Sequence, residues 1–82
     1  MDVVLKEGAR KALHKIGSND ISKVKRKLQL LSTNPLSGKV LQGGYHELRS
    51  LRAWPLRILY TFNPNTQMVT IEAIEYRGQV YK

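Results

Sequence analysis

The spacing of apolar residues changes once along this chain, and that change constrains the fold more than any other feature. Up to about residue 33, apolar side chains recur every three to four positions, as on one face of an α-helix. After Gly43-Gly44 they alternate with polar side chains, which is the pattern of half-buried β-strands. A chain of 82 residues with this order predicts a single α+β domain over residues 1–82.

The first half of the chain predicts a helical hairpin that follows a short strand, Val3–Leu5. The first helix runs from Glu7 to Ile16, and we expect Gly17 to end it. The second begins at Ser18-Asn19-Asp20, which can cap it, and ends before Asn34-Pro35 because the residue before proline avoids helical geometry. The apolar stripes are Ala9, Ala12, Leu13 and Ile16 in the first helix and Ile21, Val24, Leu28 and Leu31 in the second.

The second half predicts three strands after a loop at Leu36–Gly44. The strands are Tyr45–Ser50, Leu56–Phe62 and Met68–Glu75. Leu51–Trp54 connects the first two, and Asn63-Pro64-Asn65-Thr66 is rich in turn-forming residues and joins the last two. The expected architecture is an N-terminal helical hairpin packed on one face of a small antiparallel sheet.

Alternation along the strands assigns residues to the two sides of this sheet. We expect one set to lie under the helices: His46, Leu48 and Ser50 with Ile58, Tyr60 and Phe62. We expect the other set to face outward: Tyr45, Glu47 and Arg49 with Arg57, Leu59 and Thr61. Glu47, Arg49 and Arg57 would then converge, and Arg77 and Tyr81 could fold back over the same side. Arginines beside tyrosines suit phosphate binding and base stacking.

The charge balance points to a polyanionic partner. The chain has 14 basic and 6 acidic residues, for a formal net charge of +8. A field of this sign attracts nucleic acid, the ribosome or an acidic protein. The chain has no cysteine, no signal-like segment and no long apolar run, so we expect a cytoplasmic protein that does not use a membrane, a metal or a cofactor.

An ordered set of motifs resembles the RelE/ParE superfamily of bacterial toxins, which belong to type II toxin–antitoxin systems. The motifs are Tyr45-His46-Glu47-Leu48-Arg49, then Arg57-Ile58-Leu59-Tyr60, then Tyr76-Arg77-Gly78-Gln79-Val80-Tyr81. The resemblance covers nearly the whole chain and is strongest for the RelE-like and HigB-like branches. It implies a metal-independent endoribonuclease that cuts messenger RNA on the ribosome, and an acidic antitoxin that neutralises it.

The resemblance also implies roles for single residues. Arg57 matches an arginine that binds the scissile phosphate, and Arg77 matches a second phosphate-stabilising arginine. Tyr81 matches a tyrosine that stacks on or orients the cleaved nucleotide, and Arg49 matches a basic residue near the reactive phosphate. RelE-type toxins carry lysines where this chain has Tyr45 and Glu47.

Cleavage of RNA without a metal needs a base for the 2′-hydroxyl and positive charge on the phosphate oxygens. Arg57 and Arg77 would supply the charge. Glu47 is the candidate base. Its alternative role is to form an ion pair that holds Arg49 or Arg57 in place. His46 titrates in a suitable range, but alternation places it under the helices.

Other features keep two readings. The basic run containing Lys23, Arg26 and Lys27 is either a solvated helix face or a contact for RNA backbone. Trp54 is either an anchor of its turn or a stacking surface for RNA. At the level of function, the alternatives to a ribonuclease are a toxin of the ParE type that inhibits DNA gyrase without nuclease activity, and an inactive basic RNA-binding module.

Overall fold

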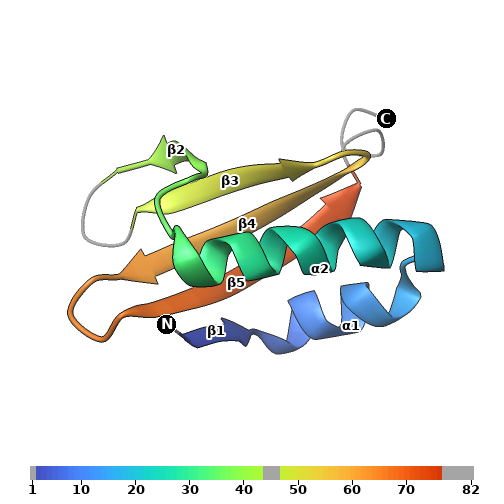
Figure 1. The fold of residues 1–82 in the computed structure, drawn as a ribbon, viewed down its shortest axis with the longest axis horizontal. Coiled ribbons are helices and arrows are strands. Elements are labelled where there is room, and N and C mark those ends of the chain that lie inside the picture. The colour runs from blue at the N-terminus through green and yellow to red at the C-terminus, as the bar shows by residue number, and fades with distance from the viewer. Residues whose placement is uncertain (1, 44–46, 77–82) are drawn as a thin grey trace.

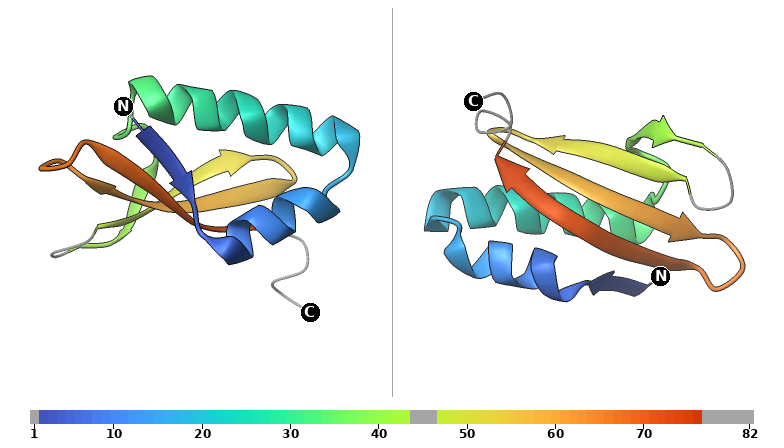
Figure 2. Two further views of the ribbon diagram at one scale, coloured as in Figure 1. Left: turned by 90° about the horizontal axis from the view of Figure 1, so that it is seen from below. Right: turned by 180° about the vertical axis from the view of Figure 1, so that it is seen from behind.

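The structure, a computed structural model, describes residues 2–43 and 47–76. Two helices pack against a five-stranded sheet, and both helices lie on the same side of it (Figures 1 and 2). The elements in chain order are β1 (Asp2–Leu5), α1 (Glu7–Lys15), α2 (Ser18–Thr33), β2 (Lys39–Gln42), β3 (Leu48–Ala53), β4 (Leu56–Asn63) and β5 (Met68–Tyr76). The predicted α+β class and the N-terminal helical hairpin are confirmed.

The sheet is mixed and larger than the sequence predicts. Its strand order is β1-β5-β4-β3-β2, and β3, β4 and β5 form the expected antiparallel meander. β1 pairs with β5 in parallel, because the chain crosses over through the two helices before it returns to the sheet. β2 lies in the segment predicted as a loop, where it pairs with β3 and forms one edge of the described sheet.

The side of the sheet under the helices, called here the helix side, holds the hydrophobic core. The predicted stripes of both helices are buried or partly buried against it. The fully buried side chains include Val24 and Leu31 of α2 and Leu56, Ile58, Tyr60, Val69 and Ile71 of the sheet. The prediction that Ile58 and Tyr60 face the helices, with Phe62 packed against the core, is confirmed.

The two helices meet at a connection that differs in detail from the expectation. α1 ends at Lys15, and Ile16 is its extended C-terminal cap. Gly17 is the N-cap of α2 with φ −65°, so it does not close α1 in the left-handed conformation. Its carbonyl accepts a hydrogen bond from the Ile21 amide at 2.9 Å, which begins the helix without a side-chain cap.

The predicted register of the first long strand is wrong by one residue. Directly opposed residues of neighbouring strands point to the same side of a sheet, and Arg49 lies opposite Tyr60 while Leu51 lies opposite Ile58. Arg49 therefore belongs to the helix side. Leu48 and Ser50 belong to the other side, because they lie opposite Thr61 and Leu59.

That other side is called here the open face, because no described helix packs on it (Figure 2, right). Its residues include Lys39, Leu48, Ser50, Arg52, Arg57, Leu59, Thr61, Thr70, Glu72, Ala73 and Glu75. Glu72 and Ala73 share this face because a β-bulge shifts the β4–β5 register there, so that Ile71 and Ile74 are both buried. Among the described helices, none is long and apolar enough to cross a membrane.

Candidate anion site on the open face

Three cations gather on the open face near the hairpin between β3 and β4. Arg52 and Arg57 lie directly opposite each other on neighbouring strands. Lys39 of β2 lies opposite Ser50, one open-face position along β3 from Arg52. These side chains line a hollow of about 350 Å³, together with Ser37, Leu41 and Leu51. We call this the basic hollow.

The pairing of Arg52 with Arg57 is unfavourable for the sheet itself. Like charges at directly opposed positions repel each other and destabilise a sheet by a few tenths of a kcal/mol. An anion bound between the two guanidinium groups would reverse the sign of this interaction. Guanidinium groups bind phosphate oxygens with paired hydrogen bonds, and Lys39 and Ser50 add further donors. The basic hollow therefore has the chemistry of a phosphate site.

A carboxylate completes the site on its other flank. Glu75 of β5 lies directly opposite Arg57, and Arg57 Nε donates to Glu75 Oε1 at 3.1 Å. Arg57 Nη2 contacts the same oxygen. Both side chains are partly exposed, 23% for Arg57 and 35% for Glu75, so the pair remains accessible from the open face. A carboxylate thus lies beside a guanidinium group of the basic hollow.

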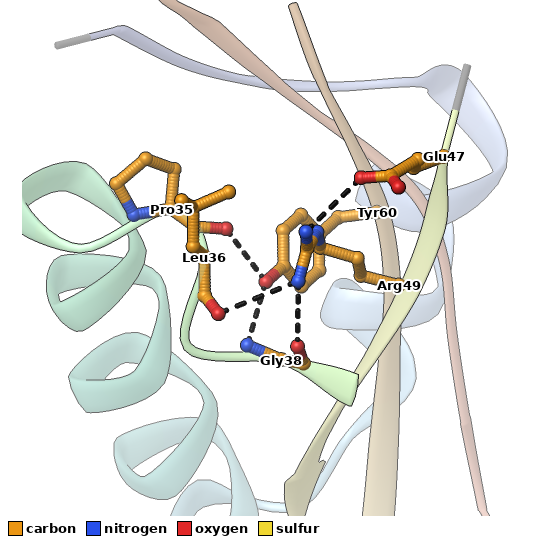
Figure 3. Close-up of polar contacts among 6 residues, drawn as sticks. All are labelled: Pro35, Leu36, Gly38, Glu47, Arg49 and Tyr60. Carbon is orange, nitrogen blue, oxygen red and sulfur yellow. Dashed lines mark hydrogen bonds and ion pairs between the residues drawn. The ribbon is translucent and has the colours of Figure 1, made fainter. Parts of the chain in front are cut away.

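Arg49 does not join this site. Its Nη1 donates to the Gly38 carbonyl at 3.0 Å and to the Leu36 carbonyl at 3.4 Å, and its Nη2 pairs with Glu47 Oε1 at 3.0 Å (Figure 3). The prediction that Glu47, Arg49 and Arg57 converge on one face is wrong. The reason is the register of β3, which places Arg49 beside Tyr60 and draws Glu47 to the same side.

Tyr60 stands at the centre of this second cluster. Its hydroxyl donates to the Pro35 carbonyl and accepts from the Gly38 amide, both at 2.8 Å (Figure 3). Burial raises the pKa of the Tyr60 hydroxyl, while the Gly38 hydrogen bond and the charge of Arg49 act in the opposite direction. The hydroxyl must stay protonated to donate to Pro35, so the raised pKa and the hydrogen-bond pattern agree.

The remaining predicted site residues fall elsewhere. Lys23, Arg26 and Lys27 lie on α2, which is on the helix side, so the structure does not bring them to the basic hollow. Tyr45, His46, Arg77 and Tyr81 lie outside the described residues. Trp54 is 63% exposed in the turn between Ala53 and Leu56, next to the strand ends that carry Arg52 and Arg57.

The sequence reasoning missed Lys39, Ser50, Arg52 and Glu75. Lys39 lies in a segment that the sequence predicts as a loop, and Arg52 lies beyond Ser50, the predicted end of its strand. Leu51 and Ala53 are two positions apart and flank Arg52, and this alternation was the signal that could have placed Arg52 outward.

A larger hollow of about 610 Å³ lies farther along the open face, toward the turn between β4 and β5. Leu48, Leu59 and Thr61 line it, and Glu72 pairs there with Lys6 at 2.7 Å and accepts from Thr61 at 3.2 Å. Within residues 2–43 and 47–76, no three histidine, aspartate or glutamate side chains are grouped closely enough to hold a metal ion.

A family model described as the ParE toxin of type II toxin–antitoxin systems, parDE, matches residues 3–81. The chain belongs to this toxin family. The resemblance to the RelE/ParE superfamily noted in the sequence is thereby confirmed. No curated protein sequence matches the chain.

Solved structures of toxins from this superfamily have the same fold. The archaeal RelE–RelB complex from Pyrococcus horikoshii matches with a TM-score of 0.85 and 19% identity over 95% of this chain and 96% of that one. The toxin–antitoxin complex RelBE2 from Mycobacterium tuberculosis matches with a TM-score of 0.81 and 28% identity over 93% and 96%. A YoeB/ParE toxin from Agrobacterium tumefaciens matches with a TM-score of 0.74 and 14% identity over 94% and 99%.

Proposed function

We propose that this toxin binds single-stranded RNA on its open face and cleaves messenger RNA on the ribosome. The observation that carries the proposal is the opposed pair Arg52–Arg57, joined by Lys39 in one hollow. A pair of opposed like charges on a sheet has no structural benefit, whereas a phosphodiester between them would be held by both. Trp54 in the adjacent turn offers an exposed aromatic surface on which a base could stack.

The chemistry would use the open-face pair of Arg57 and Glu75. The 2′-hydroxyl gives its proton to a base and its oxygen attacks the phosphorus, the bond to the 5′-oxygen breaks, and the leaving 5′-oxygen takes up a proton from water. Arg52 and Arg57 would stabilise the charge that develops on the non-bridging oxygens. Glu75 lies beside Arg57 and would accept the 2′-proton once Arg57 turned toward the phosphate, so we propose it as the base. Arg77 and Tyr81 keep the roles that the family resemblance implies.

Glu47 has a different place in this proposal. Its carboxylate pairs with Arg49 on the helix side, so its role is to orient Arg49. Glu75→Gln and Glu47→Gln make a matched pair of variants, because each exchanges a carboxylate for an amide of the same size. We expect Glu75→Gln to lower the cleavage rate by about 10²-fold or more and Glu47→Gln to have little effect. The opposite ranking would return the base role to Glu47.

The toxin also needs a neutralising partner. The solved complexes from Pyrococcus horikoshii and Mycobacterium tuberculosis each pair a toxin of this fold with an antitoxin. For a chain with a net charge of +8, we propose a cognate antitoxin with an acidic segment, because opposite charge speeds encounter and fixes register. Copurification of the toxin with the product of a neighbouring gene, at low and high salt, would test this partner.

The activity is tested by inducing the toxin in growing cells and mapping transcript ends. We expect cuts within translated reading frames that disappear when translation is blocked. Arg57→Ala should lower cleavage by about 10²–10³-fold. Arg10→Ala on α1 removes the same charge from an exposed position of the helical layer and should cleave like the wild type. Equal cleavage by the Arg57→Ala variant and the wild type would remove the phosphate-binding role.

Inhibition of DNA gyrase is the second candidate function. The observation that favours it is the family model, which describes ParE toxins. Arg57 is also already paired with Glu75, as a purely structural arginine would be. Intact transcripts together with broken or incompletely relaxed DNA after induction would support this candidate over the ribonuclease.

A further inference from the structure

The connection between α2 and β2 is fastened to the sheet by buried hydrogen bonds. Tyr60 is fully buried, and its hydroxyl joins the Pro35 carbonyl to the Gly38 amide at 2.8 Å each. These bonds span 25 and 22 residues of sequence. The turn at residues 35–38 is therefore held by the side chain of Tyr60, which reaches it from β4 (Figure 3).

Arg49 holds the same turn from β3. Its guanidinium donates to the carbonyls of Leu36 and Gly38, and its side chain is only 13% exposed. Glu47 accepts from the other end of the guanidinium and fixes its orientation. Tyr60 and Arg49 together thus bind the backbone of Pro35, Leu36 and Gly38, and Gly38 is the residue directly before Lys39.

Gly38 allows this close approach because it has no side chain. A Cβ added to Gly38 would lie 2.5 Å from the Tyr60 hydroxyl oxygen and 3.0 Å from the Ser50 carbonyl oxygen. Either distance is below ordinary contact, so the turn could not keep its position with a larger residue. The backbone therefore rests directly on β3 and β4 at the last residue before β2.

Among the described elements, β2 is held mainly by its pairing with β3. It has four residues, contains a register irregularity between Val40 and Gln42, and pairs with β3 at the edge of the described sheet. Lys39 of β2 and Ser37 of the preceding turn line the basic hollow on the open face. A short edge strand adds little stability of its own, and the fastened turn ends directly before Lys39, so the turn can set where Lys39 lies.

We propose that Tyr60 and Arg49 are positioning residues that place Lys39 in the basic hollow, where Lys39 contacts a phosphate of single-stranded RNA. The proposal rests on phosphate binding by the basic hollow, which is part of the proposed function, and does not require cleavage. In this proposal Arg49 holds the backbone of residues 36–38 and does not contact the RNA.

The test is a double-mutant cycle on RNA affinity. The probe is a single-stranded oligonucleotide with 2′-O-methyl groups, which cannot be cleaved, and binding is followed by fluorescence anisotropy at several salt concentrations. Lys39→Ala should weaken binding about three- to tenfold and reduce the salt slope by about 0.7, the amount for one phosphate contact on a single strand. Tyr60→Phe should weaken binding in the same way, because Lys39 is no longer held.

The deciding measurement is Tyr60→Phe in the Lys39→Ala background. Two residues that act through one contact are not additive, so the second substitution should then change affinity less than about twofold. An equal loss in both backgrounds would overturn the proposal. Tyr76→Phe is the matched control, because it removes the hydroxyl bonded to Asp20 at 3.2 Å, away from the turn. It should bind like the wild type.

Arg49→Lys is a second variant that keeps the net charge and the packing of the aliphatic stem. A direct phosphate contact by Arg49 predicts that this variant retains binding, whereas a positioning role predicts a loss that vanishes in the Lys39→Ala background. Arg52→Ala separates the positioning proposal from the phosphate site on which it rests. If Lys39→Ala has no effect and Arg52→Ala weakens binding, the positioning proposal fails while the phosphate site stands. If neither substitution weakens binding, the phosphate site itself fails.

Discussion

The two sides of the sheet use arginine in opposite ways. On the helix side, Arg49 donates to two backbone carbonyls and to Glu47, and it lies beside the buried hydroxyl of Tyr60. On the open face, Arg52 and Arg57 oppose each other, and their charges are offset only in part by Glu75. The first arrangement stabilises the fold. The second sets two like charges opposite each other, an unfavourable arrangement of the kind that proteins keep at functional sites.

The largest difference between the two sides should appear in apolar substitutions of adjacent residues on β4. Ile58 is fully buried on the helix side, and Leu59 is half-buried on the open face. We expect Ile58→Ala to lower the free energy of unfolding by about 3 kcal/mol and Leu59→Ala by about 1 kcal/mol. Urea denaturation measures both. Equal losses would show that the open face is covered in solution.

Gly38 should be the next most sensitive position. The close contacts of an added Cβ with Tyr60 and with the Ser50 carbonyl predict a loss of about 2 kcal/mol for Gly38→Ala, the cost typical of an overpacked site. Gly8→Ala is the control, because nothing lies near its Cβ position and alanine favours a helix, so stability should stay level or rise slightly. A tolerated Gly38→Ala would mean that the turn is free to move.

The pH dependence of stability should identify Tyr60. The folded pKa of its hydroxyl is raised above the unfolded value of about 10, so the folded state binds its proton more tightly. Its contribution is fully present below pH 10 and is lost as pH rises through the folded pKa. Thermal melts between pH 8 and 11 should therefore decline less steeply for Tyr60→Phe than for the wild type. An unchanged decline would contradict the buried position of the hydroxyl.

The smallest expected change in stability is that of Arg52→Ala, and it is an increase. Removal of one of two opposed like charges should raise the free energy of unfolding by about 0.3 kcal/mol in Arg52→Ala. Removal of Arg49, whose side chain is mostly buried and donates to the buried Gly38 carbonyl, should instead lower it by about 2 kcal/mol in Arg49→Ala. The two substitutions remove the same type of side chain from positions three residues apart on β3, one on each side of the sheet. A loss of stability in both variants would contradict the conclusion that arginines stabilise the helix side but not the open face.

Local patterns in the sequence were sufficient for the helices and for β4. The stripes of α1 and α2 and the alternation of Ile58, Tyr60 and Phe62 are strong because each residue packs on the core. β3 was ambiguous, since Leu48 and Leu51 are three apart and imply different faces. The choice of Leu48 as a core residue put Arg49 outside.

The errors that remained come from contacts between distant segments. Arg49 is held on the helix side by carbonyls of residues 36 and 38, and no local pattern shows that a charged residue will find such partners. The parallel pairing of β1 with β5 joins the two ends of the described chain. The bulge at Glu72 breaks the alternation of β5, and its position depends on how β4 packs beside it.

In the proposed function, the open face acts on the target while the helix side holds the fold. Growth after induction of Arg52→Ala and Arg10→Ala tests this division, with soluble protein measured in the same cultures. We expect Arg10→Ala to arrest growth like the wild type and Arg52→Ala to be tolerated while it accumulates as a folded protein of at least equal stability. Growth arrest of equal strength by both variants would contradict the claim.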